Sequence, residues 1–525
     1  MHPWLALYSV DVPAVIPLPA ATLLDSFLRR AQDQPDATAV FHFETPISFG
    51  TLAAAALRFA TQLASWGVGP GDRVAMSLQN DPEFLVAQYG AWMRGAIVVP
   101  LSALLKQREI AFHLSDCGAK VYVCRDDIFA SQGQHALEGT GVEHVMLSGG
   151  FEKLPAAAPD AQLPVSLEDP AYLVYTSGTT GSPKGAISLH RNIAFTAEVF
   201  RVWLDASERD VIAGIAPLFH ITGLVAQIGL SAVSGAPLIL AHRFQAAETL
   251  RLVQLHRATI SVAAITAYIA LLKEGGPLAL TSWTKCCTGG APVPPAIVDQ
   301  FAERFGVRIH NTYGLTESNS PSHLTPLGQV GPVDPLSGAL AIGLPIPNSI
   351  AKIVDPDNPS IELPPGEPGE IALQGPMLFA GYWNQPAASA AAFHEGFFLT
   401  GDIGIMDPQG WFYVVDRKKD MIVASGFKVW PREVEDVLYQ HPAVREAAVV
   451  GVPDDYRGET VKAIVAAKMP VTAAELIAFC QERMAAYKYP RVVEFVTDIP
   501  KTGTGKVYWR KLQEAEDAKT SSMPT

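Results

Sequence analysis

The sequence of 525 residues is poor in charged residues and in cysteine, and it contains no long hydrophobic run. Only 17% of the residues are charged and 49% are hydrophobic, a balance typical of a large folded protein and not of a disordered chain. No apolar stretch reaches the roughly 18 to 20 residues of a membrane-spanning helix, and the N-terminus lacks the basic cluster of a secretory signal. Together these absences predict a soluble protein of the cytoplasm.

Cysteine and positive charge are both scarce. The five cysteines form no C-x-x-C pair and no zinc-binding spacing, so we expect reduced, partly buried thiols at positions 117, 124, 286, 287 and 480. The 39 basic residues are outnumbered by 52 acidic ones, and the net charge of −13 disfavours nucleic acid as the main partner. An acidic protein that binds a polyphosphate must therefore gather its cations locally.

A loop of Gly, Ser and Thr residues lies between two apolar runs in the middle of the chain. Residues 171–175 have strand character, and the loop that follows ends in Pro183, Lys184 and Gly185 before a second apolar run. Glycines let backbone N–H groups approach an anion, while hydroxyls and a lysine add donors and a cation. A flexible linker is the alternative, but a linker would have polar flanks. The pattern predicts a phosphate-binding loop, and its spacing differs from that of a Walker A loop, which disfavours a P-loop kinase or ATPase.

Strand and helix patterns alternate along most of the chain, which favours a mostly parallel α/β sheet. Residues 126–168 are interpreted as a surface connection, and short strands between Gly and Pro at 341–412 indicate a small β subdomain. A charged run at 416–420 precedes an α+β unit whose second helix begins with a capping box at Thr472. We predict an α/β fold. A large N-terminal domain (1–415) would hold two α/β sheets and the β subdomain, and a small mobile α+β domain (416–525) would end in a frayed tail after Leu512.

A second polar motif, residues 311–317, follows a predicted strand at 307–309. We expect it to form a loop at the carboxyl end of that strand, where open α/β sheets usually bind ligands. Taken alone, the motif is more simply interpreted as a turn with an N-cap threonine and a solvated Glu317.

The loop at 176–185 resembles the signature loop of the adenylate-forming superfamily, which contains acyl-CoA synthetases, peptide-synthetase adenylation domains and beetle luciferases. Four motifs of the family occur in order along nearly the whole chain: 176–185, 311–317, 400–402 with Arg417, and 500–506. The resemblance implies that a carboxylate attacks the α-phosphate of ATP, forms an acyl-adenylate and releases pyrophosphate. In the acyl-CoA synthetases, the thiol of coenzyme A then displaces AMP.

The resemblance also implies contacts to the nucleotide and to Mg²⁺. In the second motif, Asn311 would bond the adenine amino group, Tyr313 would pack on the ring, and Thr316 would contact the α-phosphate. Glu317 would hold Mg²⁺ together with Thr176, because hard carboxylate oxygens suit this ion. The remaining positions expected to bind ATP or AMP are Ser177, Gly178, Thr179, Thr180, Gly181, Lys184, Gly290, Ala291, Thr312, Gly314, Asp402 and Arg417.

The last motif implies a mobile catalytic lysine. By its similarity to the family, Lys506 would enter the active site during adenylation and bridge the carboxylate and the α-phosphate. Lys419 matches the hinge on which the small domain rotates between the two half-reactions. After rotation, Ser425, Gly426 and Phe427 would line the channel for coenzyme A.

The acid-binding end is carried by His220, which matches the family position that gates the carboxylate, with Phe219, Ile221 and Leu224 as the acyl pocket. A core histidine bonded to a backbone carbonyl is the alternative. No acidic residue stands beside Phe219 to pair with an α-amino group, which disfavours an amino acid as the substrate. The catalytic set is thus Lys506, Thr316, Glu317 and His220.

The sequence predicts an ATP-dependent acyl-CoA ligase, with Mg²⁺ and coenzyme A, that acts on an apolar carboxylic acid. A medium- or long-chain fatty acid is favoured. An aryl or arylalkyl acid, or a stand-alone adenylation enzyme that loads a carrier protein, stays open, as does a homodimer.

Overall fold

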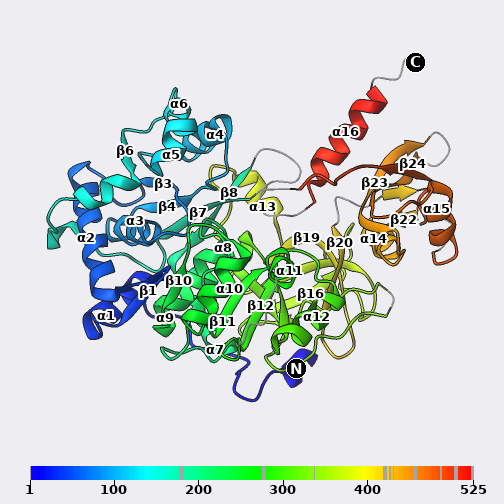
Figure 1. Ribbon diagram of the computed structural model, residues 1–525, viewed down its shortest axis with the longest axis horizontal. Helices are drawn as coiled ribbons and strands as arrows, with labels where there is room; N and C mark the ends of the chain where they lie inside the picture. Colours follow the sequence, from blue (N-terminus) through cyan, green and yellow to red (C-terminus); the bar gives the residue numbers. More distant parts are fainter. Residues whose placement is uncertain are drawn as a thin grey trace.

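The computed structural model describes ten stretches of the chain: residues 2–176, 183–274, 280–335, 337–417, 422–424, 427–429, 431–454, 458–484, 488–501 and 507–521. In Figure 1 the N-terminal part (blue to cyan) lies on the left, the middle of the chain (green to yellow) lies in the centre, and the C-terminal sheet (orange) lies on the right. Within the described residues, no helix combines the length and the apolar character required to cross a bilayer.

A six-stranded sheet forms the N-terminal part. Its strands are parallel except for the last, β8, which runs antiparallel to β7. In spatial order they are β6 (His144–Leu147), β5 (Val121–Cys124), β3 (Arg73–Ser77), β4 (Ile97–Pro100), β7 (Pro170–Thr176) and β8 (Lys184–Leu189). β4 and β5 are fully buried, as expected for parallel strands covered on both faces. The interpretation of residues 126–168 as a mere surface connection was wrong in one respect: β6 pairs with β5 and forms the edge of the sheet.

A nine-stranded sheet occupies the centre of the molecule. In spatial order it contains β15 (Leu344–Pro345), β14 (Ser320–Leu324), β13 (Ile309–Leu315), β12 (Lys285–Gly289), β11 (Ile260–Ala264), β9 (Ile212–Ala213), β10 (Leu238–Leu240), β1 (Thr38–His42) and β2 (Thr45–Ser48). The strands from β13 to β1 are parallel, and those at the two edges are antiparallel.

The prediction of a loop at 311–317 was wrong for most of the motif. β13 pairs with β12 in parallel up to Asn311 and then continues, pairing with β14 in the antiparallel sense as far as Leu315. The strand persists because β14, which the sequence did not suggest, is fully buried and supplies the partner for its backbone.

Helices cover these two sheets. α2 packs on α3, and α1 and α7 both pack on α9 (Figure 1). The helices of this part are α1 (Leu23–Asp33), α2 (Phe49–Ser65), α3 (Pro82–Met93), α4 (Gln107–Cys117), α5 (Asp126–Ile128), α6 (Gln134–Ala136), α7 (His190–Trp203), α8 (Ile221–Gly223), α9 (Leu230–Ser234), α10 (Ala246–Leu255), α11 (Ile265–Lys273), α12 (Pro295–Phe305) and α13 (Pro386–Ala391). Shorter 3₁₀ and π turns are η1 (Pro3–Leu7), η2 (Phe129–Gly133), η3 (Ser148–Lys153), η4 (Pro159–Ala161), η5 (Leu224–Gly229) and η6 (Thr316–Ser318).

The predicted small β subdomain is confirmed as a five-stranded antiparallel sheet. Its strands are β16 (Ile350–Val354), β17 (Gly369–Gln374), β18 (Phe393–His394), β19 (Phe397–Met406) and β20 (Phe412–Arg417). β19 is the centre of this sheet, since it pairs with β17, β18 and β20.

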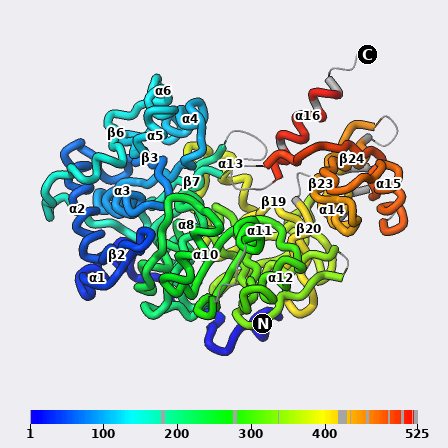
Figure 2. Tube along the Cα trace, viewed as in Figure 1, coloured from blue at the N-terminus to red at the C-terminus, as the bar shows by residue number. Residues whose placement is uncertain are grey.

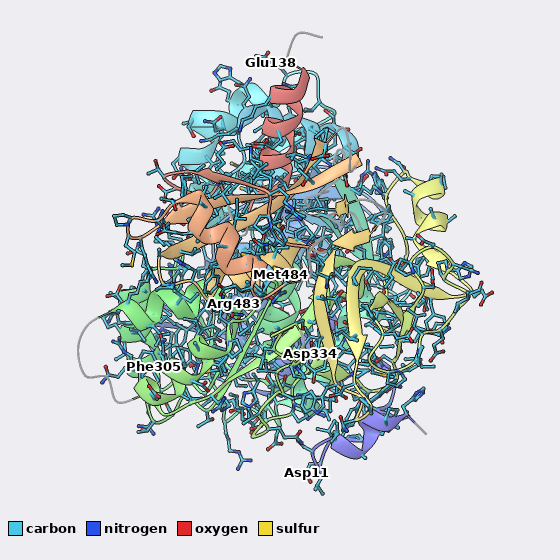
Figure 3. The ribbon with its side chains drawn as sticks, turned by 90° about the vertical axis from the view of Figure 1, so that its right-hand side faces the viewer. Asp11, Glu138, Phe305, Asp334, Arg483 and Met484 are labelled. Carbon is cyan, nitrogen blue, oxygen red and sulfur yellow. The ribbon has the colours of Figure 1, made fainter. Side chains whose placement is uncertain are left out.

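A further sheet is built only from C-terminal residues. Its strands are β21 (Ile422–Ala424), β22 (Phe427–Val429), β23 (Val444–Asp454), β24 (Gly458–Ala467) and β25 (Val492–Phe495), with helices α14 (Pro431–Tyr439) and α15 (Ala473–Gln481). The capping box at Thr472 is confirmed, because Thr472 and Glu475 exchange hydrogen bonds at the start of α15. Figure 3 turns this part toward the viewer, with Arg483 and Met484 just beyond α15. The division at residue 416 stays a prediction.

The tail after Leu512 is not frayed as expected but forms α16 (Trp509–Ser521). In Figure 2 its red tube lies beside the orange strands. Leu512 packs against Ala448 and Val450 of β23, and Glu516 of the helix bonds Lys462 of β24. Contacts to strands far back in the sequence therefore hold a helix that its polar composition did not predict. All five cysteines are buried and unpaired, as expected.

Candidate active site

The predicted phosphate-binding loop is carried by a hairpin. Its two strands, β7 and β8, pair with Thr176 opposite Lys184, and the Thr176 hydroxyl donates to the Lys184 carbonyl over 3.4 Å. The hairpin thus fixes both ends of the loop. Ser177, Gly178, Thr179, Thr180 and Gly181 lie outside the described residues.

A segment of the β subdomain runs along the other side of β8. The backbone N–H groups of Ala380 and Trp383 donate to β8 carbonyls over 2.9 and 2.8 Å, and Ala186 pairs with Tyr382. This pairing brings the Tyr382 ring beneath Lys184, whose Nζ lies 5.0 Å from the ring centroid. An ammonium over an aromatic face is held electrostatically. Sequence reasoning missed Tyr382, because only the long-range pairing with β8 places it in the site.

Glu317 of η6 approaches the same tyrosine. The Tyr382 hydroxyl donates to Glu317 Oε1 over 2.8 Å, and the Phe379 N–H donates to the Glu317 carbonyl over 2.8 Å. Burial raises the pKa of the Glu317 carboxyl, and the negative charge of Asp402 acts in the same direction, while Tyr382 and Lys184 lower it. Lys184, Glu317 and Asp402, predicted from three separate motifs, are therefore close enough to influence one another.

Asp402 is the second carboxylate of this cluster and is 7% exposed. It accepts a hydrogen bond from the Tyr313 hydroxyl over 2.6 Å, which joins two residues that were predicted to bind the same nucleoside. Gly401 precedes it in the left-handed region at φ +73°, and its N–H donates to Glu370 Oε1. Across the sheet Asp402 pairs with Arg417, whose side chain lies outside the described part of the structure.

The carboxyl ends of β11, β12 and β13 lie side by side. Ala264 is opposite Gly289 and Thr288 is opposite Asn311, so the predicted adenine-binding residues follow neighbouring parallel strands. Gly290 is exposed at φ +77°, and Ala291 after it is half-buried. The buried Asn311 amide donates from Nδ2 to the Ala341 carbonyl over 3.0 Å. An adenine amino group would instead require the Asn311 carbonyl oxygen.

Two of the predicted nucleotide-binding positions also have structural roles in β13, and a third lies next to Glu317. The Thr312 hydroxyl donates to the Thr288 carbonyl over 3.0 Å and ties β13 to β12. A Cβ on Gly314 would lie 1.6 Å from the Ser320 carbonyl oxygen, so the close pairing of β13 and β14 requires glycine there. Thr316 is half-buried and opens η6, next to Glu317.

The predicted acid-binding residues surround α8. His220 is half-buried and caps this short helix, since its Nδ1 accepts from the Thr222 N–H over 3.3 Å. The same Nδ1 lies 3.2 Å from the Thr222 hydroxyl, and the role of His220 at the acid-binding end stays a prediction. Ile221 and Leu224 are buried in the main hydrophobic core, and Phe219 is half-buried.

Asn80, which sequence reasoning missed, holds the loop before His220. Its Oδ1 accepts from the Leu218 N–H over 2.9 Å, and its Nδ2 donates to the carbonyls of Gly214 and Ala216 over 3.2 and 3.0 Å. A buried amide with three backbone bonds fixes this loop against the start of α3. No local pattern marks Asn80, because its partners lie far along the chain.

The predicted mobile parts fall outside the described residues: Lys419, Ser425, Gly426 and Lys506, together with the Phe427 side chain.

The chain matches two family models. The model described as AMP-binding enzyme matches residues 27–383, and the model described as AMP-binding enzyme C-terminal domain matches residues 433–506. A long-chain-fatty-acid–CoA ligase of Bacillus subtilis (strain 168) is 35% identical over 556 aligned positions, which cover 98% of each chain. A feruloyl-CoA synthase of an Amycolatopsis species is also 35% identical, over 91% of this chain and 96% of that protein.

Among solved structures, o-succinylbenzoate CoA synthetase from Bacillus subtilis, in complex with its acyl-adenylate intermediate, superposes with a TM-score of 0.84. It is 31% identical, and the match covers 93% of this chain and 97% of that one.

Proposed function

The chain belongs to the family of AMP-binding enzymes, and from this premise we propose that it is an AMP-forming acyl-CoA ligase. A carboxylate oxygen attacks the α-phosphate of ATP and pyrophosphate leaves. The thiol of coenzyme A then attacks the acyl carbon of the adenylate, and AMP leaves. The observation that carries the proposal is the convergence of Lys184, Tyr382 and Glu317 beside the Tyr313–Asp402 pair at the predicted nucleotide site.

We assign the two carboxylates different tasks. Glu317, with the Thr176 hydroxyl, would hold Mg²⁺, which neutralises charge on the phosphates when bound. The fit rests on donor chemistry, since Glu317 is a half-buried carboxylate whose pKa is raised by desolvation and which a cation would stabilise in its charged form. Asp402, fixed by the Tyr313 hydroxyl, would accept hydrogen bonds from the ribose, with Arg417 as its neighbour across the sheet.

Lys184 would bind the β and γ phosphates together with the loop from Ser177 to Gly181. The Tyr382 ring holds its ammonium at the end of the hairpin, so the cation is positioned before ATP arrives. Thr316 would contact the α-phosphate, where charge develops during adenylation. Gly290, Ala291 and Asn311 would form the adenine end at the carboxyl edge of the nine-stranded sheet.

The acid enters at His220, and we propose a long-chain fatty acid as the substrate. Support comes from the relatives that act on long-chain fatty acids and align with nearly the whole chain, and from the apolar residues around α8. An aryl acid is the second candidate, because the feruloyl-CoA synthase is equally similar.

An AMP-release assay decides between them. The purified protein is supplied with ATP, Mg²⁺ and coenzyme A, and with fatty acids of graded length or aryl acids. We expect the highest kcat/KM for a long-chain fatty acid. A preference for an aryl acid would replace the substrate assignment, and acylation of a carrier protein without any need for coenzyme A would overturn the ligase proposal.

The division of labour between the half-reactions rests on Lys506. We propose that Lys506→Ala reduces adenylate formation strongly and spares thioester formation from preformed acyl-AMP, because the lysine acts only while the α-phosphate is attacked. Equal loss of both steps would contradict rotation about Lys419 into a state where Ser425, Gly426 and Phe427 line the coenzyme A channel. We place the reaction in the cytoplasm. A homodimer stays a prediction that the mass of the protein in solution tests.

A further inference from the structure

Two histidines and an aspartate outside the nucleotide motifs meet at one place. His42 ends β1, Asp81 stands before α3, and His242 follows β10. Their ligand atoms, His42 Nε2, one Asp81 carboxylate oxygen and His242 Nδ1, all lie within 4.8 Å of one another. The cluster belongs to no motif that the sequence singled out, since its three members come from three distant segments.

Asp81 is oriented toward the histidines. Asp81 is the N-cap residue of α3. An N-cap aspartate normally accepts a hydrogen bond from the first turn of its helix, but the side chain of Asp81 does not. Its Oδ1 instead accepts a hydrogen bond from His242 Nδ1 and lies 3.8 Å from His42 Nε2. Asp81 as a whole is only 5% exposed, so its negative charge is buried and faces two imidazole rings.

His42 leaves a ligand atom without a hydrogen bond. Its Nε2 is buried and has no hydrogen-bond partner among the described residues. A buried ring nitrogen in this condition is unfavourable unless something else binds it. The rings of His42 and His242 stand edge to face, with their centroids 5.4 Å apart. Both rings therefore present a nitrogen to the same side of Asp81.

We propose that His42, Asp81 and His242 bind a zinc ion. Two imidazole nitrogens and one carboxylate oxygen are a ligand set that zinc accepts, with water as the fourth ligand. Bonds of about 2.0 to 2.1 Å in tetrahedral geometry separate neighbouring ligand atoms by about 3.3 Å. To reach that separation, the 3.8 Å between His42 Nε2 and Asp81 Oδ1 must shorten slightly, and the hydrogen-bonded pair of His242 Nδ1 and Asp81 Oδ1 must move apart.

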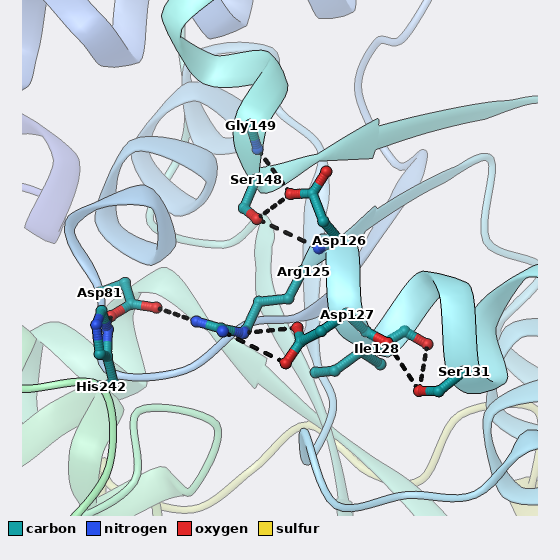
Figure 4. Close-up of polar contacts among 9 residues, drawn as sticks. All are labelled: Asp81, Arg125, Asp126, Asp127, Ile128, Ser131, Ser148, Gly149 and His242. Atoms are coloured by element: carbon teal, nitrogen blue, oxygen red, sulfur yellow. Dashed lines mark hydrogen bonds and ion pairs between the residues drawn. The ribbon is translucent and has the colours of Figure 1, made fainter.

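The charged residues next to Asp81 leave its carboxylate able to bind a cation. Figure 4 shows Arg125 between Asp81 and Asp127: its Nη1 lies 3.4 Å from Asp81 Oδ2, whereas His242 bonds Oδ1. The guanidinium is also paired with Asp127, over 3.0 and 3.4 Å. Arg125 therefore holds the far side of the Asp81 carboxylate, and Asp127 offsets its positive charge, so Oδ1 remains an anionic ligand.

A hollow lies beside the cluster. His242, Arg125, Asp127 and Glu248 are among its lining residues, so the cluster meets the hollow through His242. The His242 side chain is 49% exposed in it. The hollow gives an ion a path from solvent and gives a water molecule room to complete the coordination.

The backbone around the three ligands is fixed. The Phe43 N–H donates to the Leu240 carbonyl and the Asn80 N–H to the His242 carbonyl, both over 3.0 Å. His42 ends β1 and His242 follows β10, two neighbouring strands of the nine-stranded sheet, while Asp81 follows β3 of the six-stranded sheet. An ion held by all three would therefore join the two sheets, beside the Asn80 side chain that fixes the loop before His220.

The test uses untagged full-length protein that has been treated with a chelator and dialysed. Isothermal titration with zinc in the absence of ATP should give about one ion per chain, and cobalt(II) should give the visible absorption of a four-coordinate site. His242→Ala should weaken zinc binding at least about 100-fold, since it removes a direct ligand. Its side chain is half exposed, so the variant is expected to fold. Asp81→Asn keeps the shape of the carboxylate and should weaken binding as well.

Two controls separate this site from others. His135→Ala removes a histidine that is 63% exposed and lies away from the cluster, and Glu317→Gln removes the proposed magnesium ligand; both should bind zinc as the wild type does. Wild-type affinity in both His242→Ala and Asp81→Asn would overturn the proposal, as would a wild-type protein without the cobalt absorption. Loss of zinc binding in Glu317→Gln alone would reassign the ion to the nucleotide site.

Discussion

Two glutamates in different parts of the molecule are held in contrasting ways. Glu516 of α16 is 6% exposed and bonds Lys462 over 2.7 Å and Lys519 over 2.8 Å, and the same two lysines also bond Glu494. Glu317 accepts a hydrogen bond from the neutral hydroxyl of Tyr382. The ammonium of Lys184 lies 5.0 Å from the ring centroid of the same tyrosine. The C-terminal cluster thus pairs its carboxylates with lysines directly, whereas Glu317 is bonded by the hydroxyl of Tyr382.

The two environments shift the carboxyl pKa values in opposite directions. Hydrogen bonds from Lys462 and Lys519 lower the pKa of Glu494, while burial raises the pKa of Glu317. A carboxylate kept in an environment that disfavours its charge is typical of sites that bind a cation or carry out chemistry. In a neutralised buried cluster, the loss of one partner instead destabilises the fold, because it removes the compensation of a buried charge. The comparison predicts that substitutions in the two clusters separate activity from stability.

The largest effect is expected for Glu317→Gln. Loss of the proposed magnesium ligand should lower kcat/KM for AMP formation by about 10²- to 10³-fold, because the charge on the phosphates is no longer offset. The experiment measures AMP release together with thermal unfolding.

Stability should move the other way in this variant. The folded pKa of Glu317 lies above the unfolded value, so the stabilisation linked to its proton is present at low pH and lost as pH rises through the folded pKa. Glu317→Gln should therefore be at least as stable as the wild type near pH 7 and lose that advantage in acid. If Glu317→Gln were less stable than the wild type at pH 7 and had normal activity, Glu317 would stabilise the fold, as Glu516 does, and would not take part in the reaction.

The second effect is expected for Glu516→Gln. The substitution weakens one of the two ion pairs of the buried Lys462 and leaves Glu494 in place, so we expect a loss of about 1.5 to 3 kcal/mol in the free energy of unfolding, as for one hydrogen bond to a charged group. Adenylate formation should stay near the wild-type rate. Glu514→Gln, an exposed position on the same helix, is the matched control. Denaturant unfolding measures both, and equal stabilities would show that the cluster does not hold α16.

A smaller effect is expected for Tyr382→Phe. The phenyl ring remains beneath Lys184, but the hydroxyl that lowers the pKa of Glu317 is gone. We expect a loss in kcat/KM of about tenfold, corresponding to one hydrogen bond to a charged group. Because the ionised carboxylate is the proposed active form, the acid limb of the pH profile should move to higher pH. An unshifted limb would separate Tyr382 from the titration of Glu317.

The smallest effect is expected for Tyr313→Phe. Asp402 loses one hydrogen bond that orients it, while its backbone stays fixed in β19. The KM for ATP should rise by about threefold, with kcat nearly unchanged, since the contact is distant from the α-phosphate. A large fall in kcat would instead connect Asp402 to the reacting groups.

The sequence identified candidate site residues better than it identified their contacts. Lys184, Glu317 and Asp402 were predicted from motifs, and the structure places Lys184 and Glu317 at Tyr382, with Asp402 close enough to raise the pKa of Glu317. Tyr382 itself was missed because its place depends on pairing with β8, far earlier in the chain. Asn80 was missed for the same reason, since its bonds reach the loop at 214–218.

The errors in the fold share one physical cause. The motif at 311–317 was expected to be a loop, but buried β14 extends it as a strand, and the polar tail was expected to fray, but Lys462 and the contacts of Leu512 hold it as α16. In each case a tertiary partner overrides local propensity. The helices with clear caps and periodic apolar faces, such as α12 and α15, needed no such partner to be predicted.

The continuous strand β13 makes the spacing of the second motif a constraint in its own right. Asn311 and Tyr313 are two residues apart and share one face, and a bulge lies between Tyr313 and Gly314 before the chain reaches Glu317. One inserted residue would turn the following side chains to the opposite face. Across related proteins, this segment should tolerate amino-acid substitutions more readily than insertions or deletions. Its length should therefore vary less than its sequence.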